Sequence, residues 1–514
     1  MRSVVAVAAL GLALAAGAAG ASARDIMGSE RAERLLGTQR ADFVLGRGGR
    51  DVVVARGGRD RIAVEQDGAS DVVSCGSGDD VVTADRRDGV APDCEVVSRA
   101  LSRDVARNVG AQHATQVEPD SFAVGSTVVS TFQSGRFERG GASNVGFAAS
   151  RDGGRSWRSG FLPAITQFSR PAGPATAVSD PAVAYDSVHR RWLIASLALL
   201  PGQTRLLVSR STTGRSWSAP ITAASAAPTD DSIAFDKEWI TCDNGARSPF
   251  RGHCYLAFTD LVGRDRIVAR TSTDGGATWS PSIVVNGGGG VGAFPAVRPN
   301  GDVLVVLSDG GAMVAARSTD GGASFSAPVR IAAHRGAKVD PLRTFQLPSV
   351  DVDRSGTVYV TWHDCRFRTA CSSNDVVLAT SGDGVTWTDP ARVPLGRTSS
   401  KRAFIIPAVA ADPTRSGRLA ILYYTLSSLP CRACALDAGL VRSGTGGRTW
   451  SAGRRLSARS MRPSWLPATV SGRMLADYVS VSWSRGRPVP VFALASEPRG
   501  TSFREAIFAT TRLR

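Results

Sequence analysis

The stretch Ser150-Arg151-Asp152-Gly153-Gly154-Arg155-Ser156-Trp157 decides the fold, because variants of it recur along most of the chain. Five further copies begin at residues 210, 272, 318, 380 and 443, so successive copies are 60, 62, 46, 62 and 63 residues apart. In this S-x-D-x-G-x-[ST]-[WF] pattern, aspartate ties down its own turn, glycine supplies a positive φ, and the aromatic ring packs between sheets. We therefore interpret the motif as structural and assign it no catalytic role.

Short apolar strands with regular turns fill the segments between the copies. One segment contains Pro181-Ala182-Val183-Ala184 followed by Trp192-Leu193-Ile194-Ala195, and the other segments have a similar arrangement. Such strands at regular spacing predict an all-β protein. We count seven repeating units, of which six carry the turn motif.

The six motif copies resemble the Asp boxes of the sialidase-like (BNR-repeat) β-propeller family. The resemblance covers residues 118–514 and implies a propeller of four-stranded antiparallel blades. Seven blades is our preferred count, and six blades is the alternative. Residues 98–117 are predicted to be a linker or a closing strand.

A second repeat precedes these units. Aspartates recur at steps of 9, 9, 11 and 9 residues, each beside a short apolar stretch, and several follow glycine turns. The pattern resembles the RTX-type nonapeptide repeat, which implies a β-roll-like module over residues 37–97 with Ca²⁺ between its turns. The ligands implied by the resemblance are Asp51, Asp60, Asp71 and Asp80. Arginines immediately before Asp51 and Asp60 oppose calcium there, and a glycine-rich linker is the alternative interpretation.

The N-terminus indicates export. Arg2 precedes an uncharged apolar run over residues 3–20, and Ala21-Ser22-Ala23 is typical of a cleavage site. We predict a signal peptide over residues 1–23 and a secreted protein, with a membrane anchor as the alternative. No later segment is apolar enough to span a bilayer, so we expect no transmembrane segment in the mature chain.

Eight cysteines fall into pairs that are close in the sequence, which in an exported chain predicts disulfides. The CxxC pair leaves a redox or metal role open, but no second CxxC and no nearby histidine supports zinc. The predicted disulfides are Cys75–Cys94, Cys242–Cys254, Cys365–Cys371 and Cys431–Cys434.

The net charge of +16 comes almost entirely from dispersed arginines. Because they form no dense basic block, we expect no nucleic-acid partner. A basic surface attracts anionic glycans or cell-surface polysaccharides, which are the expected partners of a monomeric chain.

Strand order predicts which face is functional. In a four-stranded antiparallel blade, the start of the first strand and the end of the second lie on the face opposite the Asp boxes. Polar side chains gather at both places and are predicted to meet in a ligand-binding cleft. At first-strand starts they are Glu118, Asp120, Asp180, Asp236, Lys237, Glu238, Gln346, Asp477 and Tyr478. At second-strand ends they are Gln133, Asp260, Asp309, His363, Asp364 and Tyr424.

The resemblance to sialidases implies roles for some of these residues. It implies Tyr478 as nucleophile, Glu238 as its activator, and Asp180 or Asp260 as the acid. Arg343, Arg402 and Arg473 are candidates for a clamp on the sugar carboxylate. The other predicted substrate contacts are Asp236, Lys237, His363, Asp364 and Asp477. The implied activity is that of an exo-α-sialidase-like glycoside hydrolase on anionic glycans.

The first unit departs from the family pattern. Sialidases carry an arginine in that opening, whereas this chain has Val117-Glu118-Pro119-Asp120. The departure favours the alternative of a non-catalytic propeller that binds glycans or cell surfaces. A lyase acting on uronic-acid polymers through His363 or Tyr424 is a third possibility.

Overall fold

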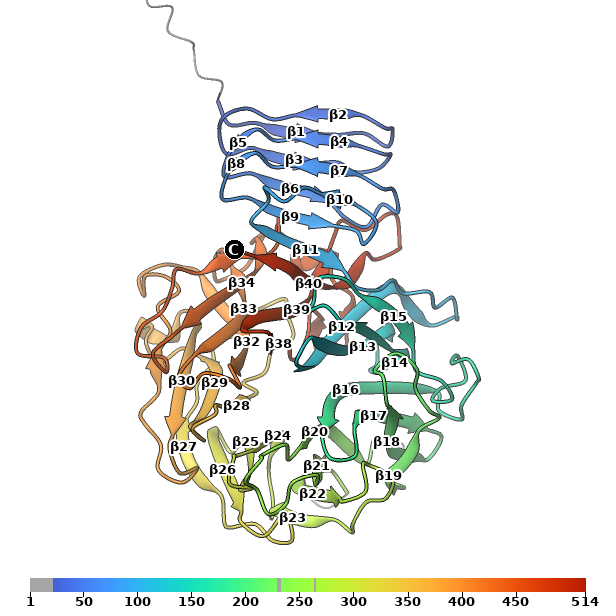
Figure 1. Cartoon of the computed structure of the whole chain (residues 1–514), viewed down its shortest axis with the longest axis vertical. Helices are drawn as coiled ribbons and strands as arrows, with labels where there is room; N and C mark the ends of the chain where they lie inside the picture. The colour runs from blue at the N-terminus through green and yellow to red at the C-terminus, as the bar shows by residue number, and fades with distance from the viewer. Residues whose placement is uncertain (1–21, 229–232, 263–264) are drawn as a thin grey trace, which may run out of the picture.

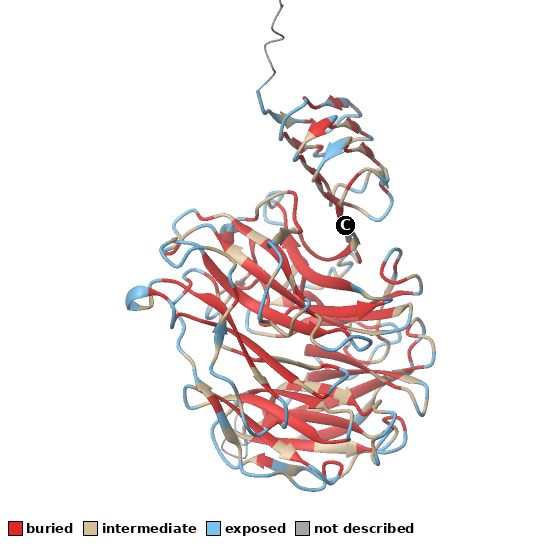
Figure 2. Cartoon of the chain, turned by 60° about the vertical axis from the view of Figure 1, so that its left-hand side comes forward, coloured by how far each residue is buried: buried red, intermediate tan, exposed pale blue. Residues whose placement is uncertain are grey.

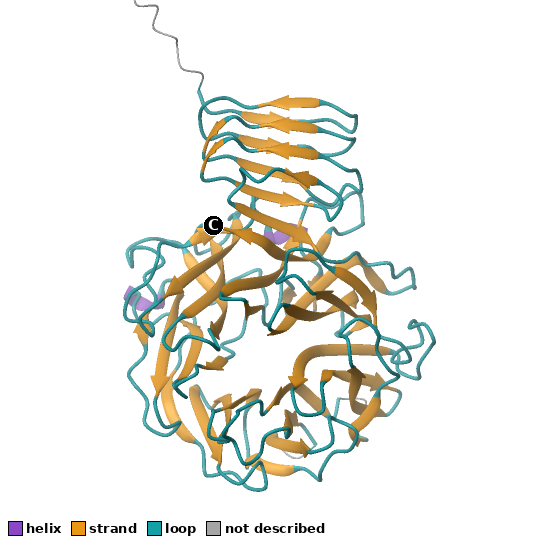
Figure 3. Ribbon diagram, in the orientation of Figure 1, coloured by secondary structure: helices purple, strands orange, loops and turns teal. Residues whose placement is uncertain are grey.

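The computed structural model describes residues 22–228, 233–262 and 265–514, and its regular structure in these ranges is almost entirely β-strand (Figure 3). Two short 3₁₀ helices are the exceptions, η1 (Thr369–Cys371) and η2 (Pro463–Trp465). The predicted all-β class is therefore confirmed. The predicted signal peptide lies outside the described residues, apart from its last two positions.

The first part of the chain is a β-solenoid of about four turns (Figure 1). One parallel sheet contains β1 (Asp25–Met27), β3 (Phe43–Leu45), β6 (Arg61–Val64), β9 (Val81–Ala84) and β11 (Val96–Ala100). The opposite parallel sheet contains β2 (Arg34–Leu36), β4 (Val52–Val54), β7 (Val72–Ser74) and β10 (Gly89–Val90). The short strands β5 (Gly57–Gly58) and β8 (Ser77–Gly78) pair at one corner.

Alternating burial explains why this repeat coils. Val44, Ile62 and Val82 of one sheet and Val53 and Val73 of the other are fully buried, and together they fill the interior of the solenoid. Glycine is required at residue 78, where φ is +147° and an added Cβ would lie 1.5 Å from the carbonyl oxygen of the turn below. The turns therefore stack only because glycine permits this close approach.

Two columns of aspartates join successive turns. In one column, the carboxylates of Asp60 and Asp80 accept the backbone N–H groups of Asp42 and Asp60, both at 2.7 Å. In the other, Asp71 accepts the N–H of Asp51 at 2.7 Å. Each aspartate thus satisfies a buried backbone donor one turn earlier in the chain, and this is the physical reason for the repeat's aspartates.

The antiparallel strands follow the solenoid and lie around a common centre (Figure 1). An eight-stranded sheet contains β12 (Ala111–Val124), β13 (Thr127–Phe137), β14 (Ala142–Ser150), β15 (Arg158–Phe161), β16 (Ala177–Asp186), β17 (Arg191–Leu200), β18 (Gln203–Ser211) and β19 (Ile221–Ala226). Three four-stranded sheets follow: β20 (Phe235–Cys242), β21 (Cys254–Asp260), β22 (Arg266–Ser272) and β23 (Ile283–Asn286); β24 (Val291–Val297), β25 (Val303–Asp309), β26 (Ala312–Ser318) and β27 (Val329–Ala333); β28 (Ser349–Val352), β29 (Val358–Asp364), β30 (Asp375–Ser381) and β31 (Ala391–Arg392). The rest are β32 (Ala403–Ala411), β33 (Leu419–Leu426), β34 (Leu436–Ser443) and β35 (Arg454–Arg455), the hairpin β36 (Ala468–Thr469) and β37 (Gly472–Arg473), and β38 (Ser480–Ser484), β39 (Arg487–Ala495) and β40 (Glu505–Leu513).

The predicted β-propeller of four-stranded blades is wrong, in both its seven-bladed and its six-bladed form. The chain is organised as a β-solenoid of about four turns with several further sheets, and two of the sheets contain eight strands. The reason is strand pairing across the expected boundaries. β11 pairs with β9 in parallel and with β40 antiparallel, so one sheet continues from the solenoid to the C-terminus. Pairing of Ala142 with Val178 likewise joins β14 to β16.

The motif turns have the structural role expected of them. The Asp152 carboxylate accepts the backbone N–H groups of Arg155 and Ser156, and the Trp157 indole donates to the carbonyl of Gly154 at 3.0 Å. In the copy that begins at residue 443, where Thr445 takes the place of the aspartate, the hydroxyl of Thr445 accepts the N–H of Thr449 at 2.9 Å. Figure 2 shows the result, with burial following the strands and exposure concentrated in turns.

All four predicted disulfides are confirmed, including Cys431–Cys434, which settles the CxxC pair as a disulfide. None of the helices described is long and apolar enough to cross a membrane.

The aspartate columns predict a stability difference between two substitutions. Replacing Asp60 with alanine leaves the buried N–H of Asp42 without an acceptor, which should lower the free energy of unfolding by about 1–3 kcal/mol. Asp60→Asn keeps an acceptor oxygen and should cost less. Denaturant unfolding in calcium-free buffer measures the difference, with the exposed Asp25→Asn as control. Equal stability of Asp60→Ala and wild type would contradict the role of the columns.

Candidate functional site

Backbone bulges deliver the charged side chains of the site. Apart from a further shift in β12 between Gln112 and Gln116, each of the innermost strands β12, β16, β20, β24 and β32 shifts its register with the neighbouring strand at one point. A residue in the left-handed region lies at each shift, and its φ lies between +45° and +72°. These residues are Glu118, Asp180, Lys237, Gly292 and Ile406. A positive φ at non-glycine residues is unfavourable, and it is common at sites where side chains must be aimed.

Three of these bulge residues meet in one group of charges. The Lys237 ammonium lies 2.7 Å from Asp477 Oδ2, 3.3 Å from Asp180 Oδ1 and 3.8 Å from Glu118 Oε1. The Arg343 guanidinium also donates to Asp477 Oδ2. We call Glu118, Asp180, Asp236, Lys237, Arg343 and Asp477 the axial cluster. It brings together five of the predicted site residues and Glu118, which the strand-end pattern had singled out.

Burial and mutual attraction set the protonation of the axial cluster. Burial opposes ionisation of Asp477, but Lys237 and Arg343 outweigh it and hold the pKa of Asp477 below its usual value. Burial likewise opposes the charge on Lys237, but Asp180 and Asp477 raise its pKa well above the usual value. Burial raises the pKa of Glu118 to about 8, with Asp477 and Asp180 adding to the effect against Lys237. At neutral pH the cluster therefore holds an ionised Asp477 beside a mainly protonated Glu118.

Asp236 and Asp180 form a carboxyl pair at the edge of the cluster. Burial raises the pKa of Asp236 to about 6, and the negative charge of Asp180 together with a hydrogen bond between the two side chains adds to the rise. Two neighbouring carboxyl groups that share a proton are a familiar source of an acid that works near neutral pH.

Tyr478 and Glu238 lie beside the cluster without hydrogen-bonded partners. The Tyr478 hydroxyl and both carboxyl oxygens of Glu238 are buried and have no partner among the described residues, so the two groups are not hydrogen bonded to each other. Burial, with the charges of Glu118 and Asp180, raises the pKa of Tyr478 well above its usual value. The phenol is therefore neutral at ordinary pH.

Two arginines present unused donors to the same region. The Nε atoms of Arg343 and Arg136 are buried and have no partner among the described residues. The electrostatic neighbours of Arg136 include Glu118, Arg343 and Asp477, which places it next to the cluster. The sequence analysis missed Arg136, because it lies three residues beyond Gln133 in β13, past the expected strand end. Gln133 itself donates to Glu118 and, at 3.1 Å, to Ser179.

Other predicted site residues lie outside the cluster. Asp260 forms an ion pair with Arg266 at 2.8 Å. Arg402 is exposed, and the side chain of Arg473 donates to the carbonyl of Leu466 at 2.9 Å. The predicted three-arginine clamp is therefore not formed, because only Arg343 reaches the cluster.

His363 and Asp364 form a separate group. His363 Nε2 contacts Gln346 Nε2 at 3.1 Å, and burial lowers the pKa of His363 to about 4. Asp364 pairs with Arg366 at 2.8 Å. The Tyr424 hydroxyl donates to the carbonyl of Ala493 at 2.8 Å and accepts the N–H of the same residue at 2.9 Å.

The solenoid aspartates offer one carboxylate oxygen each to a cation. The Oδ2 atoms of Asp51, Asp60, Asp71 and Asp80 are buried and have no partner in the described part of the chain, whereas their Oδ1 atoms accept backbone N–H groups. Calcium needs six to eight oxygens, so backbone carbonyls of the glycine turns would have to supply the others.

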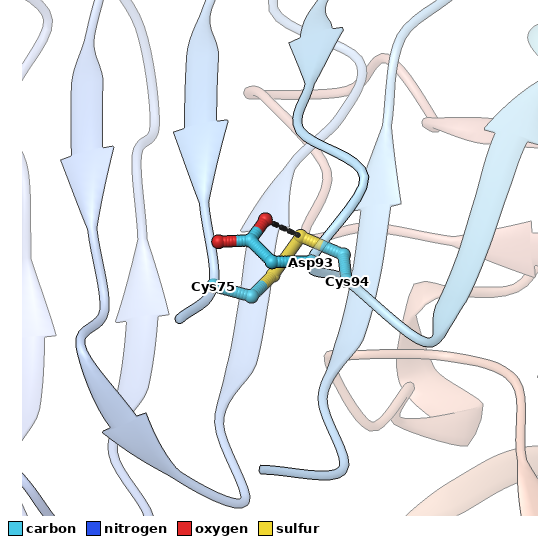
Figure 4. Close-up of side chains that lie close together, drawn as sticks. All are labelled: Cys75, Asp93 and Cys94. Atoms are coloured by element: carbon cyan, nitrogen blue, oxygen red, sulfur yellow. Dashed lines mark hydrogen bonds between the residues drawn. A yellow bond between two sulfur atoms is a disulfide. The ribbon is translucent and has the colours of Figure 1, made fainter. Parts of the chain in front are cut away.

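Cys75, Asp93 and Cys94 are the one close group of three potential metal ligands found among the described residues (Figure 4). Both sulfurs form the disulfide, and an oxygen of Asp93 lies 3.8 Å from Cys94 Sγ. A disulfide sulfur is not a thiolate ligand, so this group does not fit a metal ion.

Fold and site together define an all-β protein with a solenoid and a buried cluster of acidic and basic side chains. No protein-family model and no curated protein matches the chain. Among solved structures, the Hadza microbial sialidase Hz136 is similar at 16% identity and a TM-score of 0.42, over 68% of this chain and 67% of that one. The NanB sialidase of Streptococcus pneumoniae is similar at 11% identity and a TM-score of 0.40, over 80% and 69% of the two chains. A polysaccharide lyase, the PL25 ulvan lyase, has 12% identity and a TM-score of 0.44, over 78% and 95%.

The axial cluster predicts a large effect of Lys237 on stability. Lys237→Met removes the ammonium and leaves Asp180 and Asp477 facing each other in a buried site, which should cost about 3–5 kcal/mol of unfolding free energy. Lys237→Arg keeps the charge and should recover part of the loss. The matched control is Lys338→Met, because Lys338 forms an exposed ion pair with Asp340 and should contribute nothing measurable. If denaturant unfolding gives Lys237→Met the same unfolding free energy as this control, the stabilising role of Lys237 in the axial cluster is refuted.

Proposed function

We propose that the chain is an extracellular glycoside hydrolase, sialidase-like in its chemistry, that acts on glycans with an anionic sugar. The observation that carries the proposal is the carboxyl pair Asp180–Asp236, of which Asp180 is an electrostatic neighbour of the neutral phenol of Tyr478. This combination supplies an acid and a nucleophile in one buried site. Export is supported by the apolar run at the N-terminus and by the four disulfides.

The carboxyl pair suits general acid–base work. A pKa of about 6 keeps Asp236 partly protonated near neutral pH, so it can donate a proton to the leaving oxygen of a glycosidic bond. The charge of Asp180 and its hydrogen bond with Asp236 help to keep the proton on Asp236. After departure of the leaving group, the same pair can accept a proton from water.

Tyr478 is the proposed nucleophile. Its oxygen attacks the anomeric carbon while the ionised form of Glu238 takes the phenolic proton, and Asp236 protonates the departing oxygen. Burial and the charge of Asp180 raise the pKa of Glu238 well above its usual value, so the step uses the minor, ionised form of Glu238. Water then displaces the tyrosyl oxygen from the sugar, gives one proton to Asp236, and the phenol regains its proton from Glu238. A neutral phenol approaches an anionic sugar with less repulsion than a carboxylate would, and tyrosine is the known exception to the two-carboxylate rule.

The two guanidinium groups support an anionic substrate. Arg136 and Arg343 each keep one buried N–H donor free among the described residues, and a sugar carboxylate is an acceptor that guanidinium groups bind well. Arg136 in β13 thereby supplies a positive charge, which is missing from residues 117–120 at the start of the first repeating unit.

A non-catalytic glycan-binding protein is the second candidate. The observation that favours it is the absence of a hydrogen bond between the Tyr478 hydroxyl and Glu238 in the described structure. A binding protein needs the arginines and the axial cluster but no proton transfer to Tyr478.

Substitution of the nucleophile tests the choice between the two candidates. Because the Tyr478 hydroxyl has no partner, Tyr478→Phe should leave folding intact and lower turnover of a fluorogenic sialoside or uronide by about 100-fold or more. Binding of the released sugar acid should persist in the variant. The exposed carboxylate Asp389 gives the control Asp389→Asn. If the wild-type protein binds the sugar acid but hydrolyses no glycoside of such a panel, the hydrolase is refuted and the glycan-binding protein is the remaining candidate.

The pH profile tests the acid. Only protonated Asp236 can donate, and its raised pKa of about 6 means that the protonated fraction falls as pH rises through about 6. We therefore expect kcat/KM to decline above about pH 6, and Asp236→Asn to remove most of the activity at every pH. A profile that stays flat from pH 5 to 8 would exclude Asp236 as the acid.

We further propose that the solenoid binds Ca²⁺ through the free Oδ2 atoms of Asp51, Asp60, Asp71 and Asp80, with arginines at residues 50 and 59 weakening the sites beside them. A ligand that binds only the folded state raises the melting temperature with its concentration. Calorimetry should therefore show a higher Tm in Ca²⁺ than in EGTA, and a smaller difference for Asp71→Asn. Mg²⁺ at the same concentration is the control. An unchanged Tm would mean that these aspartates bind no Ca²⁺ and only accept backbone hydrogen bonds.

A further inference from the structure

A cavity of about 780 Å³ lies along the centre of the antiparallel sheets, beyond the axial cluster. It is lined by the innermost strands β12, β20, β24, β28, β32 and β38, and its volume is within the range of small-molecule sites. Of the residues used in the glycosidase proposal, only Asp477 and Tyr478 line this cavity, so most of the cavity has no assigned role.

Aromatic rings form the part of the cavity wall that adjoins the cluster. The rings of Trp239 and Phe294 have centroids 4.3 Å apart, and Tyr478 meets Trp239 edge-on at 5.0 Å. All three residues line the cavity, and Trp239 is half-buried whereas the other two are buried. The indole of Trp239 thus presents an apolar surface to a ligand in the cavity.

Two adjacent residues join the cavity to the axial cluster. Asp477 and Tyr478 line the cavity and are only 6% and 7% exposed. Asp477 Oδ2 is used by Lys237 and Arg343, but Asp477 Oδ1 and the Tyr478 hydroxyl are buried and have no partner within the described ranges. Buried polar atoms without partners are costly, and a ligand with hydroxyl groups would satisfy them.

The charges of the site separate two kinds of ligand group. Lys237 and Arg343, the cations of the axial cluster, do not line the cavity. An anionic sugar therefore belongs on the cluster side, and a neutral group belongs beside Trp239. A sugar ring combines an apolar C–H face for the indole with hydroxyls for Asp477 and Tyr478.

We propose that the cavity at Trp239 is a binding site for a neutral sugar ring, the residue joined to the anionic sugar in an oligosaccharide substrate. Trp239 is its specificity-determining contact, and Asp477 Oδ1 accepts from a ring hydroxyl. The inference rests on the proposed function for its link to hydrolysis, but the binding site itself can be measured without turnover.

Calorimetric titration of the full-length protein with lactose, maltose and cellobiose tests the site, with glucose as the single-ring comparison. We expect at least one disaccharide to bind, and Trp239→Ala to weaken that binding about tenfold, the size of one lost ring contact. Trp239→Phe keeps an aromatic face and should stay within about threefold of wild type. Trp387→Ala, at a partly buried tryptophan in another core cluster, is the matched control.

The outcomes separate the two proposals. Failure of wild-type protein to bind any of the three disaccharides, or equal binding by a folded Trp239→Ala, would overturn the neutral-sugar site. Circular dichroism and unfolding establish that Trp239→Ala folds, and quenching of Trp239 fluorescence, assigned as the signal lost in Trp239→Phe, provides an independent readout. Disaccharide binding without hydrolysis of any glycoside would refute the glycosidase and leave this site standing.

Discussion

The pairing of β11 with β40 is the constraint on which the rest of the structure depends. Residues 96–100 pair in parallel with β9 and antiparallel with residues 508–513, so one sheet contains both the base of the solenoid and the C-terminal strands. This ladder fixes the solenoid on the antiparallel sheets and brings the first and last parts of the chain together. It also covers an edge of the last sheet that would otherwise offer unpaired backbone groups.

The site depends on local departures of the innermost strands from regular β geometry. A regular strand alternates its side chains, and it cannot direct charges from several strands to one point without leaving the ladder. The bulges at Glu118, Asp180 and Lys237 do so at the cost of an unfavourable φ. The ammonium of Lys237 then makes the assembly stable, because carboxylates that repel one another share a cation. Buried polar atoms of Tyr478, Glu238 and the two arginines have no partner among the described residues, and in the proposed function a ligand would supply partners for them.

Much of this could be predicted from residues with one local role. Alternating apolar residues predicted the all-β class, paired cysteines predicted every disulfide, and the aspartate period predicted stacked turns. The motif around Asp152 correctly predicted a turn at that position, but the β-propeller inferred from its repeats is wrong. A turn motif shows that two strands are connected and does not show which strands belong to the same sheet. Pairings such as β11 with β40 or Ala142 with Val178 join distant segments and leave no local signal.

The strand-end pattern singled out Asp180, Lys237 and Asp477, whose side chains meet in the axial cluster, because side chains at equivalent strand positions converge whatever the sheet boundaries. Arg136 could not be recognised, since one more residue along β13 changes the face to which a side chain points. Arg402 and Asp260 were predicted to reach the cleft, but Arg402 is exposed and Asp260 pairs with Arg266. A position in the sequence indicates the end of a strand, but it does not give the direction of the side chain or its partner.

The ladder between the first hundred residues and the last seven has a consequence for how the chain reaches this structure. More than 400 residues separate its two strands, so forming this contact costs loop entropy that folding of the intervening chain reduces. Residues 508–513 therefore extend a sheet that begins with β1 in the solenoid. Deletion of residues 508–513 would leave β11 without its antiparallel partner and would remove the ladder that joins the solenoid to the antiparallel sheets.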